Sequence, residues 1–150
     1  MAADMKVRAI STATTGAYSS ACQRGLPAIL MERGGGGRFT DSEVQAYKRD
    51  MKNIMIRMGL LSGEEVHTVQ QKNVTRAEYL EAETDGLWYP VFSAGDVFAG
   101  GEILGTVRDI WGNLLREYRA EYPGIILYQT VGLGVKAGDP LIAYGEYVDR

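Results

Sequence analysis

The chain has 150 residues, one cysteine, one histidine and a formal net charge of −3. This length suits one domain or two small lobes, and a hydrophobic content of 45% supplies enough apolar surface for a core. A single cysteine excludes an internal disulfide framework, and a single histidine excludes a metal site with two histidine ligands from this chain alone. We therefore expect a folded protein of a reducing compartment, the cytoplasm.

Charge is divided unevenly along the chain. Residues 1–59 carry 9 Lys/Arg and 5 Asp/Glu, a net of +4, whereas residues 60–150 carry 7 and 14, a net of −7. The basic residues are scattered and are not interleaved with stacking aromatics, which argues against a nucleic-acid partner. No apolar run approaches the roughly 20 residues of a membrane span, so we expect no membrane partner either.

The first part of the chain has the pattern of an α/β lobe. Thr15–Arg24 has small residues and a closing glycine, which is typical of a short helix. Leu26–Glu32 is a compact apolar run with a proline near its start, which predicts a buried strand. Four consecutive glycines, residues 34–37, then interrupt regular structure.

A second helix is predicted from residue 40 to residue 58. Thr40 and Glu43 have the spacing of a capping box, and Gly59 supplies a natural end. Apolar residues follow at spacings of three and four, which places one apolar stripe on the helix: Val44, Tyr47, Met51, Ile54, Met55 and Met58. We expect this methionine-rich stripe to be part of the core.

After residue 61 the pattern changes to short apolar runs separated by glycines, which predicts a β lobe over residues 62–150. Val97–Leu104 reappears 38 residues later as Val135–Ile142, each copy reading Val-x-Ala-Gly-x-x followed by two apolar residues. Two such hairpins indicate a small barrel or sandwich.

Glu32 is the strongest candidate for a catalytic residue. It ends the predicted strand and precedes the four glycines, so a buried carboxylate there would be placed for general-base work. Arg33 and Arg38 could contact an anionic substrate, although side chains of all three kinds at such positions are more often solvated surface charges. The glycine run matches neither the P-loop nor the dinucleotide-binding spacing. His67 is expected to be exposed or hydrogen-bonded and not a metal ligand.

The order of these segments resembles the C-terminal half of the succinylglutamate desuccinylase/aspartoacylase family. The segments that carry the resemblance are Gly25–Gly35, the helix that ends at Met58-Gly59-Leu60-Leu61, and the two glycine-turn hairpins. The resemblance covers roughly residues 10–145. It implies a partial zinc carboxypeptidase-like α/β lobe, residues 1–61, followed by the β lobe, residues 62–150.

The resemblance also implies an activity, the hydrolysis of an N-acyl amide of a small amino acid-like substrate. In such enzymes two histidines and a glutamate hold zinc, and a separate glutamate is the general base and then the acid. Glu32 matches the position of that second glutamate. The family's His-x-x-Glu motif does not occur in this sequence. We therefore expect that this chain supplies the base, has no zinc ligands, and is inactive alone.

Three explanations of a site that has the base but no zinc ligands remain open. The chain is a piece of a longer protein, which we favour, or it is one product of a split gene, or it is a degenerate inactive relative. We expect the missing N-terminal half, or self-association, to cover apolar surface left bare on the first lobe. The alternative function is a non-catalytic binding module, because the two hairpins also resemble biotinyl/lipoyl carrier domains. No lysine lies at the expected hairpin tip, where Arg108-Asp109-Ile110 stands instead. The sequence identifies neither the acyl group nor the amino acid.

Overall fold

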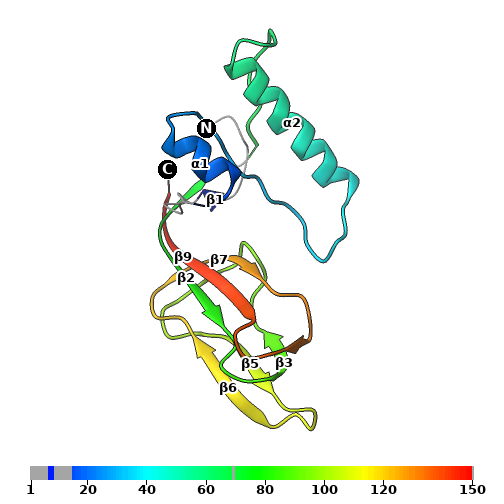
Figure 1. Cartoon of the computed structure of the whole chain (residues 1–150), viewed down its shortest axis with the longest axis vertical. Coiled ribbons are helices and arrows are strands. Elements are labelled where there is room, and N and C mark those ends of the chain that lie inside the picture. Colours follow the sequence, from blue (N-terminus) through cyan, green and yellow to red (C-terminus); the bar gives the residue numbers. More distant parts are fainter. Residues whose placement is uncertain (1–6, 9–14, 69, 150) are drawn as a thin grey trace. The chain divides into compact units, whose positions relative to one another are not determined.

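The computed structural model describes residues 7–8, 15–68 and 70–149, which fall into two compact units, Met1–Gln71 and Lys72–Arg150 (Figure 1). The first unit contains a two-residue strand and two helices among its described residues: β1 (Val7–Arg8), α1 (Ala17–Gln23) and α2 (Asp41–Arg57). The second unit is built of strands: β2 (Lys72–Glu81), β3 (Gly86–Pro90), β4 (Val97–Phe98), β5 (Ile103–Arg108), β6 (Leu114–Arg119), β7 (Gly124–Gln129), β8 (Gly134–Val135) and β9 (Pro140–Asp149). Neither described helix is long and apolar enough to span a membrane.

Helix α2 begins as the sequence predicts. The Glu43 amide donates to Thr40 Oγ1 at 3.3 Å, and the Thr40 amide donates to Glu43 Oε2 at 2.6 Å, which completes the capping box. Gly59 follows the helix with φ +73°, a left-handed conformation that favours glycine. The helix is therefore specified by local sequence at both ends.

We expect Thr40→Ala to remove this cap and to lower the free energy of unfolding of the first unit by about 1 kcal/mol. Loss of helical circular dichroism in urea would measure the change. Gln45→Ala, an exposed position on the same helix, is the control and should stay close to wild type. Equal stability of Thr40→Ala and Gln45→Ala would contradict the role of the cap.

The apolar stripe of α2 is not the core that the sequence predicted. None of its six residues is buried, and Met51 and Met58 are 50% and 67% exposed. The buried residues of α2 are instead Ala46, Asp50 and Asn53. Helical spacing identifies an apolar face, but what covers that face depends on the rest of the fold. In the described part of the first unit, the segment around Glu32 packs on the face that carries Tyr47 and Asp50, and Met51 and Met58 stay exposed.

The strand predicted at Leu26–Glu32 is also wrong for this structure, because the segment is irregular there. A buried strand needs hydrogen-bonded neighbours. No strand of the first unit pairs with this segment among its described residues. Leu26 and Leu30 are accordingly 61% and 59% exposed.

The second unit consists of two antiparallel sheets, with strand orders β2-β9-β7-β4 and β6-β5-β3-β8. This arrangement bears out the β character predicted for the second lobe. The core between the strands is one cluster that includes Trp88, Leu104, Val107 and Tyr144, each at most 2% exposed. Trp88 and Tyr118 pack edge to face with ring centroids 5.7 Å apart.

The two predicted glycine turns are present, but their matching positions lie 37 residues apart, one fewer than the 38-residue spacing of the sequence repeat. β4 leads to β5, and β8 leads to β9, through turns in which an acidic side chain accepts a backbone amide. The Ala99 amide donates to Glu102 Oε2 at 2.7 Å, and the Lys136 amide donates to Asp139 Oδ2 at 2.8 Å. Gly101 and Gly138 follow the same left-handed path, with φ +83° and +88°. A third copy precedes β4 and was not noticed in the sequence: the Ser93 amide donates to Asp96 Oδ2 at 2.8 Å.

Candidate functional site

Glu32 lies in the irregular segment that follows α1. Its side chain is exposed, whereas its neighbours Met31 and Arg33 are half-buried. Arg33 is turned toward α2, where it pairs with Asp50, whereas the Glu32 side chain is open to solvent. The burial that the sequence analysis expected for this carboxylate is not present.

Helix α2 holds the backbone on both sides of Glu32. The Tyr47 hydroxyl donates to the Met31 carbonyl at 3.3 Å, just before Glu32. Just after it, the Arg33 guanidinium forms an ion pair with Asp50 and lies over the Tyr47 ring, 5.5 Å from its centroid. Tyr47 and Asp50 are three residues apart and so share one face of α2. The result is a fixed segment that presents one carboxylate to solvent.

The glycines form a tight turn that changes the direction of the chain. Gly36 and Gly37 have φ +62° and +68°, and the Arg38 amide donates to the Gly35 carbonyl at 3.2 Å, which is the geometry of a type I′ turn. At Gly34 a Cβ would lie 2.9 Å from Glu43 Oε1, so the segment also passes close to the start of α2. The glycines are therefore required by the backbone conformation of this turn and by its close approach to α2.

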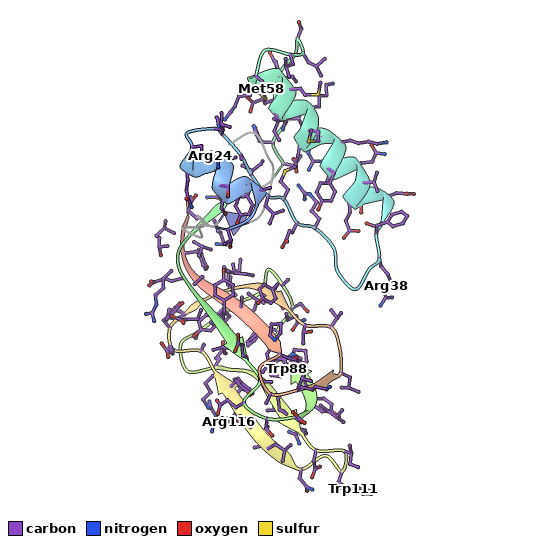
Figure 2. The ribbon with its side chains drawn as sticks, in the orientation of Figure 1. Arg24, Arg38, Met58, Trp88, Trp111 and Arg116 are labelled. Carbon is purple, nitrogen blue, oxygen red and sulfur yellow. The ribbon has the colours of Figure 1, made fainter. Side chains whose placement is uncertain are left out.

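The three sequence-predicted site residues lie in different environments. Arg33 turns toward α2, where its side chain is 18% exposed, and Glu32 is exposed to solvent. Arg38 is exposed at the end of the glycine turn (Figure 2). The Arg33 guanidinium therefore fixes the segment against α2, whereas the Arg38 guanidinium is open to solvent.

Tyr47 and Asp50 are the members of this site that sequence reasoning missed. Tyr47 was assigned to the apolar stripe, and Asp50 was not singled out. Asp50 is fully buried, and a buried carboxylate requires a cation or several donors. Its position three residues after Tyr47 on the same helix face was the signal that could have found it.

The chain's histidine lies in an exposed group of charges beyond α2. His67 Nε2 is 3.1 Å from Glu65 Oε2, and Arg57 donates two hydrogen bonds of 2.7 Å to the same carboxylate. The bond from Arg57 is the main reason why the pKa of Glu65 is lowered. Among the described residues, no three His, Cys, Asp or Glu side chains are grouped to hold a metal ion. The described residues by themselves therefore do not fit a zinc site.

The sequence of the chain is similar to that of one known deacetylase. No protein-family model matches the chain. It is 28% identical over 127 residues to the N-alpha-acetyl-L-2,4-diaminobutyric acid deacetylase of Halomonas elongata, and the match covers 81% of this chain and 37% of the deacetylase.

Solved structures give the fold. The ectoine utilization protein EutE of Ruegeria pomeroyi is 25% identical with a TM-score of 0.84, covering 96% of this chain and 48% of that protein. A succinylglutamate desuccinylase/aspartoacylase of Rhodobacter sphaeroides is 24% identical with a TM-score of 0.82, covering 98% and 47%. The chain spans less than half the length of each of these proteins. Its fold is that of the C-terminal half of the succinylglutamate desuccinylase/aspartoacylase family, as the sequence resemblance predicted.

Proposed function

We propose that this chain is the base-bearing part of a zinc-dependent hydrolase that cleaves the N-acyl amide of a small amino acid-like substrate. The observation that carries the proposal is the placement of Glu32, held by α2 on both sides with its carboxylate open to solvent, in a chain similar to a deacetylase. Glu32 would take a proton from the water that attacks the acyl carbon and deliver it to the leaving amine.

The other predicted residues take separate roles in this proposal. Arg38, on the glycine turn, would contact the substrate carboxylate, because an exposed guanidinium suits a bidentate contact. Arg33 would act by fixing the segment against Asp50. Residues 1–61 would be part of the catalytic domain, and residues 62–150 would shape the substrate entrance. The zinc ligands would come from a second, N-terminal segment.

Exposed apolar side chains on the first unit support the need for such a segment. Leu30, Phe39 and Met58 are 59%, 77% and 67% exposed, and further apolar residues are at least 40% exposed: Leu26, Ile29, Met51, Leu60, Leu61 and Val66. An isolated soluble protein rarely leaves this many large apolar side chains open. The N-terminal half of an amidohydrolase of this fold would cover them.

A chimera tests the proposal. The part of the Halomonas deacetylase that has no counterpart in this chain is fused before residue 1, and hydrolysis of an Nα-acetylated diamino acid is measured. We expect the fusion to be active and Glu32→Gln to lower kcat by about 10²–10⁴, the usual contribution of a general base. Binding of a hydrophobic dye should fall, because the apolar side chains of the first unit become covered.

Glu64→Gln is the matched control for charge, since Glu64 is also exposed. It should leave kcat unchanged in the fusion. Equal kcat for Glu32→Gln and Glu64→Gln would remove Glu32 from the mechanism. Hydrolysis and stoichiometric zinc in this chain without the fusion would refute a site that has the base but no zinc ligands.

A further inference from the structure

The hairpin between β5 and β6 presents a tryptophan to solvent. Ile110 and Trp111 at its tip are 76% and 82% exposed, and Leu114, the first residue of β6, is 54% exposed. Figure 2 shows Trp111 at the end of this hairpin, far from the other tryptophan, Trp88, in the core of the same unit. The candidate hydrolytic site does not use this surface. Large exposed aromatic residues are typical anchors of protein interfaces.

The tip is held in one conformation by Asp109. Its Oδ1 accepts the amides of Trp111 and Asn113, each at 2.8 Å, and its Oδ2 accepts the Asn113 side chain at 2.8 Å. The Gly112 carbonyl accepts from Arg108 at 3.0 Å. A fixed loop pays little conformational entropy on binding, so the exposed indole is preorganised for a contact.

A shallow groove lies beside the tip on the outer face of β3, β5 and β6. Its lining includes Tyr89, Thr106, Arg108 and Leu114. Tyr89 is 43% exposed, and the Arg108 guanidinium lies 5.9 Å from the centre of its ring. An aromatic ring with a guanidinium above it is a surface on which an indole can stack. The same unit therefore carries both an aromatic projection and a groove suited to receive one.

The charges beside the tip are self-complementary. Arg108 donates to neutral oxygens, Thr106 Oγ1 at 3.3 Å and the Gly112 carbonyl at 3.0 Å, so its positive charge remains. Asp109 accepts from neutral donors, and the hydrogen bond from Asn113 is the main reason why its pKa is lowered, which keeps it ionised. When two copies meet around a two-fold axis, neighbouring charges of opposite sign can pair across the contact.

We propose that the β5–β6 hairpin is a contact with a second copy of this chain, in which Trp111 of each copy lies in the Tyr89–Arg108 groove of the other. Each copy supplies one projection and one groove, so the contact closes on itself as a two-fold dimer. The surface at one hairpin is small, so the dimer should be weak and should form at about 10 µM to 1 mM chain.

Two measurements on the full chain test this contact. Sedimentation at increasing chain concentration should show a dimer, and acrylamide quenching of tryptophan fluorescence should fall over the same range as Trp111 becomes covered. Trp111→Ala should weaken the dimer at least about 10-fold, as expected for a central aromatic anchor, and should leave only the unquenched fluorescence of Trp88. Val131→Ala, at a loop position 72% exposed, is the matched control and should dimerise like wild type.

Three results would overturn the proposal. The first is a chain that stays monomeric and whose Trp111 fluorescence is quenched by acrylamide to the same extent throughout the concentration range. Association that survives Trp111→Ala but is lost in Leu30→Glu, on the first unit, would assign self-association to that unit. A blue shift of Trp111 fluorescence on neutral phosphatidylcholine vesicles, with the chain monomeric, would assign the tip to a lipid surface.

Discussion

Replacing Asp50 by alanine should lower the free energy of unfolding of the first unit by about 3 kcal/mol, the usual cost of removing one partner of a buried ion pair. Asp50 is fully buried, and the side chain of Arg33 is only 18% exposed. The substitution therefore removes a negative charge that faces a guanidinium largely withdrawn from water. Helical circular dichroism during urea unfolding measures the loss, because the described helices lie in this unit.

Two variants separate the charge effect from other causes. Glu64→Ala removes an exposed carboxylate from the same unit and should change the free energy of unfolding by less than about 0.5 kcal/mol. Arg33→Met combined with Asp50→Leu removes both charges and keeps apolar volume, so it should be more stable than Asp50→Ala alone. If the double variant is the less stable of the two, the ion pair contributes through something other than compensation of a buried charge.

This ion pair also links stability to the candidate site. Arg33 follows Glu32 directly, and the Tyr47 hydrogen bond to the Met31 carbonyl precedes it. Loss of Asp50 should therefore loosen the segment that orients Glu32. In our proposal, the buried polar side of α2 positions the general base.

The parts of the fold that were predictable from sequence are those that local interactions determine. The helix Asp41–Arg57 carries its own start in Thr40 and Glu43 and its own end in Gly59. The hairpin turns carry their own glycines and acidic acceptors, as at Gly101 and Glu102. Each of these signals acts within a few residues, so tertiary context did not override it.

The wrong predictions concern what covers an element. Leu26–Glu32 has the composition of a buried strand, but pairing requires neighbouring strands that the described residues of the first unit do not provide. The apolar stripe that includes Met51 and Met58 was correctly predicted to share one helix face, but the prediction that it is part of the core was wrong. Periodicity records which residues share a face, not whether another element lies on it.

The candidate site was predictable only in part for the same reason. Glu32 was selected because it ends an apolar run before glycines and matches a family position, both of which are sequence properties. Tyr47 and Asp50 lie 15 and 18 residues later, and only the fold brings them to the segment around Glu32. A contact across such a separation leaves no periodic trace in a single sequence.

In the second unit, Gly105→Ala should lower the free energy of unfolding by about 3 kcal/mol, the upper end of the cost of overpacking. A Cβ at Gly105 would lie 2.2 Å from Trp88 Cη2 and 2.7 Å from Cζ2. Trp88 cannot move aside easily, since it is 2% exposed and packed edge to face on Tyr118. Gly105 is thus required by the indole that fills the core.

Gly134→Ala is the matched control, because Gly134 also lies in a strand, has no left-handed φ, and its Cβ would have open space. Its free energy of unfolding by calorimetry should stay within about 0.5 kcal/mol of wild type. Trp88→Leu is destabilising alone, but adding Gly105→Ala to it should cost at least about 1 kcal/mol less than in wild type, because the clashing ring is gone. Additive losses in the double variant would show that Gly105 is needed for its backbone and not for the space that Trp88 occupies.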